Sequence, residues 1–292
     1  MFNAKLIVID AFVKHLQQAY LDTYSNLGPD YPGIIAFTCR MALENIARSE
    51  APYHDMEHTI MVAQVGQEII RGKHLAEGGV GPRDWVNFII SLLCHDIGYV
   101  RGVCNGDRYG HYVINFEGDT ITLPRGATDA SLTPYHVERG QIFVKERLGN
   151  SGIIDADVIM DNIEHTRFPV PANEDSRNIR DLPGLLRAAD LIGQMADPDY
   201  IRKLSALYTE FKETGAAEKM GYHSAADLRD SYPKFYWGMV SPYVEEGIRY
   251  LRMTHMGRLW TANLFNHIFS EEHHLPYIAG PERGEENLGE KN

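Results

Sequence analysis

The stretch FIISLLCHDIG, Phe88–Gly98, is the one around which the rest of the chain is organised. It is apolar except for Ser91 until it ends abruptly in His95 and Asp96. A buried helix is a rigid support, so two polar side chains at its end are held in fixed positions. Burying them costs several kcal/mol unless they are paired or bound to a metal ion. The alternative is a helix end that reaches the surface, with both side chains solvated.

Hydrophobic spacing elsewhere predicts a mainly helical chain. We expect helices over residues 4–25, 32–49, from 55 onward, 82–94, 133–148, 155–166, 182–196, 198–214, 224–230, 242–253 and 257–270. Thr133 and Pro134 suit the N-cap and the first position of the helix that would carry His136 in its first turn. The alternation in RYGHYVINFEGDTITLPRG, residues 108–126, predicts a small β-hairpin or loop insertion near residues 103–130.

The predicted fold is therefore all-α. Residues 1–275 form a single helical domain, with a metal-site core at about 50–200 and C-terminal helices at 198–275. The tail, residues 276–292, is rich in Gly, Glu and Asn and is expected to be disordered.

The composition excludes several classes of protein. A net charge of −12 argues against a nucleic-acid polymer as partner. Three cysteines without a CxxC pair fit a reducing compartment, so the cytoplasm is the expected location. Asp10 and Lys14 interrupt the apolar N-terminal run, which argues against a signal peptide and against a membrane partner.

Further metal-capable side chains lie on both sides of His95. His54 and His58 are four residues apart, a spacing that can place both on one face of a helix, although surface histidines are equally compatible. His136 and His165 each lie near a predicted helix end, where a capping or core role is the simpler interpretation. Asp190 interrupts the apolar face of LLRAADLIGQM, and Arg187 on the same helix is a possible salt-bridge partner.

Taken in order, His58, His95-Asp96, His136, His165 and Asp190 resemble the HD-domain superfamily of metal-dependent phosphohydrolases, over roughly residues 50–200. The pattern H…HD…D is the core of that superfamily, and members with two further histidines bind a pair of metals. The sequence Tyr53-His54-x-x-x-His58 is also similar to the first motif of the cyclic-nucleotide phosphodiesterase branch. The resemblance implies an HD-domain helical bundle.

The resemblance also implies roles for these residues. His58, His95, Asp96 and Asp190 would bind the first metal, and Asp96 would bridge to a second metal completed by His136 and His165. Two divalent ions would be present, with iron or manganese favoured and Mg, Zn or Ni also compatible. Asp96 and His54 would be the catalytic residues, with His54 as proton donor to the leaving group.

The named branches differ from this chain in their specificity motifs. Tyr99 follows HDIG, where the branch that cleaves cyclic dinucleotides has Lys, and Thr166–Pro169 stands where that branch has its GYP triplet. No Gln follows Gln194, whereas the cyclic-nucleotide phosphodiesterases read the purine with a downstream Gln. Positive side chains that could grip a phosphate are Arg101, Arg139, Arg167 and Arg187, of which Arg101 and Arg167 are the predicted substrate-binding residues. A salt bridge is the alternative for each.

The sequence thus predicts an enzyme, a metal-dependent hydrolase of a small-molecule, nucleotide-like phosphate mono- or diester that uses a metal-activated water. Two alternatives stay open. HD-fold proteins also include di-iron oxygenases that act on small polar substrates, and non-catalytic signalling or scaffold modules. The apolar stretch GRLWTANLFNHIF, Gly257–Phe269, could serve a homodimer, although core packing is the simpler interpretation.

Overall fold

The computed structural model describes residues 2–172 and 177–273. It is an all-α fold with a small β insertion, as predicted from the sequence. The helices are α1 (Ala4–Tyr24), α2 (Tyr31–Ile46), α3 (Met56–Glu77), α4 (Pro82–Cys94), α5 (His136–Leu148), α6 (Ala156–Glu164), α7 (Leu182–Met195), α8 (Tyr200–Glu213), α9 (Ala216–Met220), α10 (Ala225–Phe235), α11 (Ser241–Leu251) and α12 (His255–Glu272). The predicted disordered tail, 276–292, lies outside the described residues.

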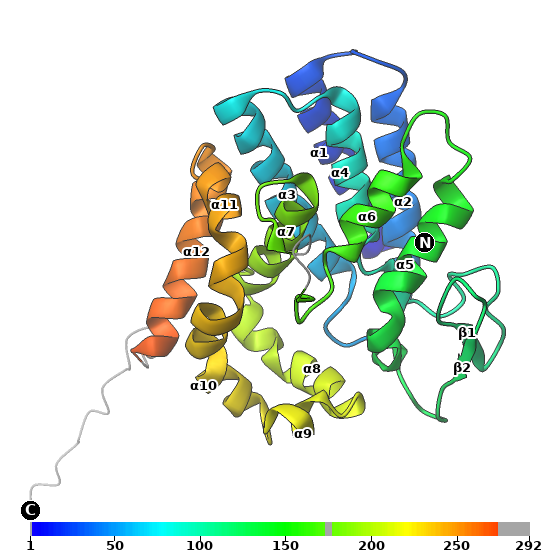
Figure 1. Ribbon diagram of the computed structural model, residues 1–292, viewed down its shortest axis with the longest axis vertical. Helices are drawn as coiled ribbons and strands as arrows, with labels where there is room; N and C mark the ends of the chain where they lie inside the picture. Colours follow the sequence, from blue (N-terminus) through cyan, green and yellow to red (C-terminus); the bar gives the residue numbers. More distant parts are fainter. Residues whose placement is uncertain (1, 173–176, 274–292) are drawn as a thin grey trace, which may run out of the picture.

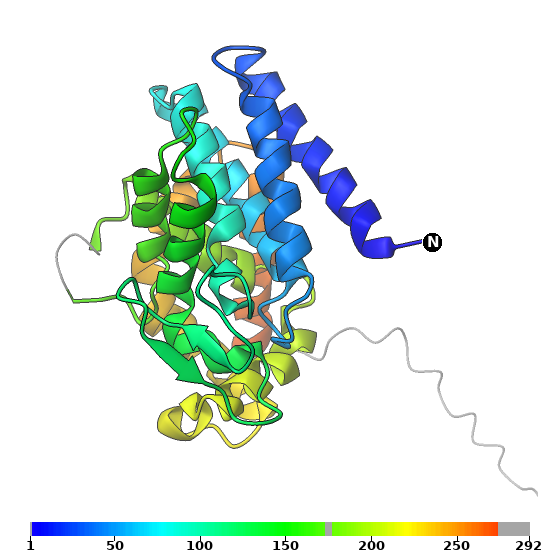
Figure 2. The same cartoon turned by 90° about the vertical axis from the view of Figure 1, so that its right-hand side faces the viewer.

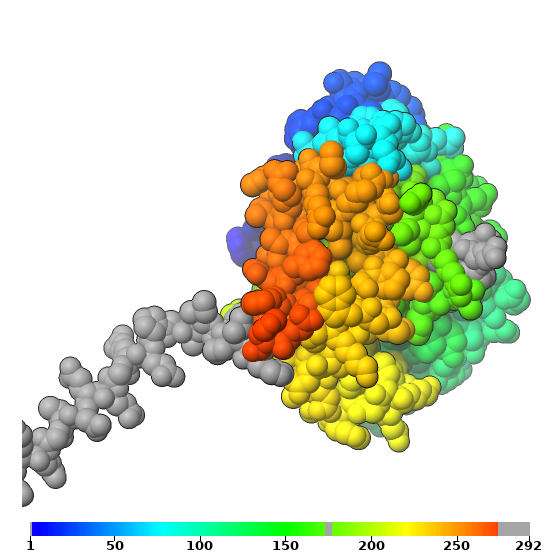
Figure 3. Space-filling view, turned by 60° about the vertical axis from the view of Figure 1, so that its left-hand side comes forward, coloured from blue at the N-terminus to red at the C-terminus, as the bar shows by residue number. Residues whose placement is uncertain are grey.

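The apolar helix that ends in His95 lies inside the bundle. Helix α4 packs between α2, α3 and α6, and α7 packs against α3 and α11 (Figure 1). A single cluster of buried apolar side chains extends from Ile9 in α1 to Ile268 in α12. Helices α1 and α2 lie together on one side of the bundle (Figure 2). Helices α11 and α12 lie side by side on another face (Figure 3).

The predicted insertion forms a two-stranded antiparallel hairpin. Strand β1 (His111–Val113) pairs with β2 (Thr120–Thr122), with Tyr112 opposite Ile121. Gly118 has a φ of +85° in the connection, a conformation that glycine adopts without steric cost. The hairpin extends from the side of the bundle next to α5 (Figures 1 and 2). The alternation of polar and apolar residues therefore identified a real change of secondary structure.

Several predicted helix boundaries were wrong: α10 continues to Phe235, five residues beyond its predicted end, α2 ends at Ile46, and the start of α5 differs. Thr133 and Pro134 do not start α5; they lie in a 3₁₀ helix, η2 (Asp129–Tyr135), and α5 begins at His136. The Thr133 hydroxyl donates to the carbonyl of Ala130 and caps no helix N–H. The tighter 3₁₀ turn tolerates Pro134 and still delivers His136 to the first position of α5.

Two glycines allow the close approach of the segments that carry polar side chains. A Cβ at Gly98 would lie 1.9 Å from the carbonyl oxygen of His136, so only glycine lets the turn after α4 touch the start of α5. A Cβ at Gly193 would lie 2.8 Å from Cα of Val62, so glycine also lets α7 touch α3. This second contact lies one helical turn from both His58 and Asp190.

None of the described helices has both the length and the apolar character that a membrane-spanning segment needs.

Candidate metal centre

Four polar side chains from three helices converge inside the bundle. His58 lies in the first turn of α3, His95 and Asp96 directly follow α4, and Asp190 lies in α7. Oδ2 of Asp96 is 3.2 Å from Nε2 of His58 and 3.1 Å from Nε2 of His95. Oδ1 of Asp190 is 3.6 Å from each of the same two nitrogens. Each of these residues presents an atom that a metal ion could bind.

Helix capping fixes where two of these side chains start. Asp55 caps α3 by accepting hydrogen bonds from the N–H groups of Glu57 and His58, at 2.9 and 3.0 Å. Asp181 caps α7 in the same way through the N–H of Gly184. With both helices fixed at their first turns and in contact through Gly193, His58 and Asp190 face each other.

His95 is held as a metal ligand would be. Its Nδ1 is 2.8 Å from the carbonyl oxygen of Leu92, which can only accept, so Nδ1 carries a proton. In the neutral ring, Nε2 would therefore be the nitrogen with the lone pair that a metal ion needs. His95 and Asp96 are 1% and 4% exposed. Among the described residues, the buried atoms His95 Nε2 and Asp96 Oδ2 form an ion pair with each other at 3.1 Å and make no hydrogen bond to any other group. Buried polar atoms of this kind are rare in proteins and call for a partner.

The electrostatics of the cluster favour a cation. Burial disfavours the charged ring of His95, but Asp96 and Asp190 outweigh it and raise its pKa well above the usual value. Burial would raise the pKa of Asp96, but His95 and His58 outweigh it and hold that pKa well below the usual range. The two carboxylates therefore create a negative potential at the imidazole nitrogens.

His136 approaches the same carboxylate from its other side. Its Nε2 is 3.8 Å from Oδ1 of Asp96, while Oδ2 faces His58 and His95. Its Nδ1 is 2.6 Å from the carbonyl oxygen of Thr133, so Nε2 again presents a lone pair. Burial lowers the pKa of His136, which favours the neutral ring that a ligand needs. Asp96 thus turns Oδ2 toward His58 and His95, and Oδ1 toward His136.

His165 lies at the C-terminal end of α6, where its ring contacts the helix backbone. Its Nδ1 is 3.0 Å from the carbonyl oxygen of Asp161. Its own carbonyl accepts a hydrogen bond of 2.8 Å from Nε of Arg187, one turn before Asp190 in α7. The side chain belongs to neither group of potential ligands found among the described residues. Its role as a ligand stays a prediction.

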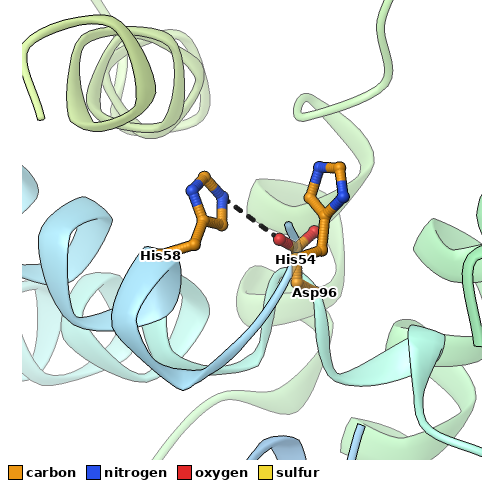
Figure 4. Close-up of side chains that lie close together, drawn as sticks. All are labelled: His54, His58 and Asp96. Atoms are coloured by element: carbon orange, nitrogen blue, oxygen red, sulfur yellow. Dashed lines mark ion pairs between the residues drawn. The ribbon is translucent and has the colours of Figure 1, made fainter. Parts of the chain in front are cut away.

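His54 lies beside the cluster and is held by an acidic residue. The rings of His54 and His58 and the carboxylate of Asp96 face one another in Figure 4, and these three also form a potential ligand group. Nδ1 of His54 is 2.5 Å from Oε2 of Glu210, whose Oε1 accepts from the N–H groups of Tyr53 and His54. Burial opposes the charged ring, but Glu210 outweighs it and raises the pKa of His54 to about 9.

Tyr99 separates two of the histidines. Its ring stacks on His54, with centroids 4.6 Å apart, and on His136, with centroids 4.5 Å apart. Tyr99 is 2% exposed, so the sandwich is rigid. Tyr99 therefore sets the spacing of the two imidazoles.

Glu210 and Tyr99 were not among the predicted site residues. A signal for Glu210 was present in the sequence. In α8 the buried residues are Tyr200, Leu204, Leu207 and Glu210, so an acidic side chain continues an apolar helical face. Such a carboxylate needs a partner, and the partner is His54. Tyr99 carried no comparable signal, because an aromatic residue after an apolar helix is ordinarily a core residue.

The two predicted substrate-binding arginines, Arg101 and Arg167, differ in how many of their guanidinium nitrogens already have partners. All three guanidinium nitrogens of Arg101 have partners, in ion pairs with Asp129 and Glu50 and a hydrogen bond to the carbonyl of Ala127, so the salt-bridge interpretation holds. Arg167 pairs with Glu164 through Nε and lines a cavity that His136 also lines. We therefore keep Arg167 as a candidate for substrate binding and leave out Arg101.

Comparisons with known proteins give one match. A family model described as Npun_R2479-like matches residues 2–274, which is nearly the whole chain. Comparison with curated proteins and with solved structures found no match.

Proposed function

The chain belongs to the Npun_R2479-like family, and we propose that it is a metal-dependent phosphohydrolase that cleaves a phosphate mono- or diester. The observation that carries this proposal is the contact network of His58, His95, Asp96 and Asp190, which come from three parts of the bundle; the first three are buried and Asp190 is partly exposed. Imidazole nitrogens and carboxylate oxygens in this number are a typical donor set for Fe, Mn, Zn or Ni. The resemblance to the HD-domain superfamily supports the same reaction.

The residues fit a metal ion. His95 Nε2 and Asp96 Oδ2 are buried with only the ion pairs of the cluster as partners, and the proton on Nδ1 of His95 is fixed by Leu92. An ion at this point would satisfy both atoms. We propose iron or manganese, with a second ion held by Asp96, His136 and His165. Such ions supply positive charge that neutralises a phosphate and lowers the pKa of water to near neutral.

His54 is the proposed proton donor. The water oxygen forms its bond to phosphorus as the bond from phosphorus to the leaving oxygen breaks. That oxygen takes the proton from Nε2 of His54, and the proton lost by water passes to solvent. Glu210 keeps the other nitrogen protonated and orients the ring, because its Oε2 accepts from Nδ1 at 2.5 Å. Glu210 is therefore a positioning residue.

Replacing His54 by Ala is expected to slow hydrolysis of an alkyl phosphate ester by about 10²–10⁴-fold. The p-nitrophenyl ester should be slowed much less, since p-nitrophenolate leaves without protonation. Glu210→Gln should show the same selectivity with a smaller loss, and Glu44→Gln, exposed in α2, is the control. The measurement is kcat for both esters together with metal content. Loss of metal in His54→Ala would make His54 a ligand instead of a proton donor.

The first test of the proposal is elemental analysis of the protein purified without added metal, followed by assays of phosphate-ester hydrolysis with and without oxygen. About one or two ions per chain and oxygen-independent release of phosphate are expected. Oxygen consumption coupled to turnover would replace the hydrolase by an oxygenase. A chain that takes up no metal on titration would be a non-catalytic module, and the proposal would fail.

A further inference from the structure

A cavity of about 480 Å³ opens beside the metal centre. Three segments enclose it. They are the junction of η2 and α5, the segment after α6, and the junction of α8 and α9; the lining residues are Thr133, Pro134, His136, Val137, Arg167, Phe168, Pro169, Pro171, Thr214, Ala216 and Lys219. His136 is part of this wall, and its Nε2 is 3.8 Å from Oδ1 of Asp96. A molecule in the cavity therefore lies next to the proposed site of cleavage, and the volume suits a small-molecule substrate.

The charge of the cavity is opposite to that of the chain. The chain has a net charge of −12, yet no Asp or Glu occurs among the described lining residues, and Arg167 and Lys219 bring two positive charges. In the ranges 2–172 and 177–273, no ion pair or hydrogen bond occupies the ammonium of Lys219. Arg167 uses Nε for Glu164, and within the same ranges its two Nη groups have no partner. These donors are available to a ligand.

The position of the two cations separates them from the reacting phosphate. The phosphate that is cleaved must lie at the cluster of His58, His95 and Asp96, whereas Arg167 and Lys219 line a cavity whose wall includes His136 but none of these three residues. Two cations match the charge of a phosphomonoester, which is between −1.5 and −2 at neutral pH, better than that of a carboxylate. Between them, Val137 and Phe168 offer apolar contact.

The geometry points to a substrate that carries two phosphoryl groups: the one that is cleaved, at the metal centre, and a second one in the leaving group, bound in this cavity by Arg167 and Lys219. This inference rests on the proposed function for the location of the cleaved phosphate. It assigns to Lys219 a role in specificity. Arg167, from the segment after α6, and Lys219, from α9, would hold the second phosphoryl group from two sides.

The test uses stable probes and equilibrium binding. The full-length protein, with the metal it is purified with, is titrated calorimetrically with propylphosphonate and with alkane bisphosphonates whose phosphonates are separated by one to six carbons. The best bisphosphonate is expected to bind about tenfold or more tightly than propylphosphonate, since the second anion gains charge-assisted hydrogen bonds. Lys219→Ala and Arg167→Ala should each reduce this ratio by about tenfold. Lys219→Arg should retain it.

The control is Lys212→Ala, because Lys212 is exposed in α8 and does not line the cavity. A ratio near one in the wild-type protein, or a ratio unchanged in the Arg167→Ala/Lys219→Ala double variant, would overturn the inference. Failure of the proposed function would give a different result: propylphosphonate would bind the Asp96→Asn variant as tightly as it binds the wild-type protein. The two outcomes are therefore separable.

Discussion

Replacing Arg139 by leucine is expected to lower the free energy of unfolding by about 3–5 kcal/mol, since it leaves a buried charge without its partner. The guanidinium of Arg139 is fully buried and forms a bidentate pair with Asp107, at 3.0 Å for each oxygen. Its Nε donates to the carbonyl of Gly98 at 2.7 Å, and Nη2 donates to that of Val100 at 2.9 Å. Nη1 also donates to the carbonyl of Val113 in β1.

These contacts join three parts of the molecule. Asp107 in turn accepts from the N–H groups of Gly102 and Val113, at 2.9 Å each. Arg139 therefore fastens the turn that follows Asp96 and the hairpin insertion to α5. Leucine would leave the Asp107 carboxylate, which is 2% exposed, without a counter-charge. Loss of the Arg139 contacts should also increase the mobility of the turn that directly follows the predicted ligands His95 and Asp96.

Urea unfolding followed by circular dichroism measures this effect. Arg147→Leu, in the same helix but exposed, is the matched control and is expected to change stability by less than about 0.5 kcal/mol. Arg139→Leu combined with Asp107→Leu should recover part of the loss, because no isolated charge is left in the interior. A loss below about 1 kcal/mol in Arg139→Leu would show that water enters and solvates Asp107.

Much of the fold was predictable because helix faces and helix ends are local properties. The apolar run that ends in His95 could be identified as buried from its composition, and the cost of burying His95 and Asp96 required partners for them. The resemblance to the HD-domain superfamily then implied one site made of His58, His95, Asp96, His136, His165 and Asp190. The structure brings His58, His95, Asp96 and Asp190 into contact, with His136 3.8 Å from Asp96, and the role of His165 stays a prediction. The hairpin was predicted from alternation within one short segment.

The rest depends on contacts between distant parts of the chain. Glu210 contacts His54 across 156 residues, and nothing local indicates which histidine a buried carboxylate meets. The same holds for Lys219, an exposed lysine whose proximity to His136 exists only after α9 packs near α5. Arg101 and Arg139 were candidates for phosphate binding by their spacing from the motifs. Their actual partners, Asp129 and Asp107, are set by the turn after α4 and by the hairpin.

Replacing Asp96 by Asn is expected to remove bound metal and to lower the rate of phosphate-ester hydrolysis by about 10³-fold or more. Asp96 is the residue on which the proposed centre depends most. One of its oxygens is 3.2 Å from His58 and 3.1 Å from His95, and the other is 3.8 Å from His136. Asparagine keeps the shape of the side chain but removes the charge and one of the two acceptor oxygens. It therefore cannot offer an oxygen both on the side of His58 and His95 and on the side of His136.

The comparison that isolates this effect is Asp157→Asn, which removes a carboxylate from the exposed face of α6. Metal content by elemental analysis and kcat are measured for both variants, with circular dichroism to show that each is folded. Loss of activity with metal retained would place Asp96 at the substrate and leave His58, His95 and Asp190 as the ligands. Full activity and full metal content in Asp96→Asn would contradict the proposed centre. His58, His95 and Asp190 would then hold the ion without the Asp96 carboxylate.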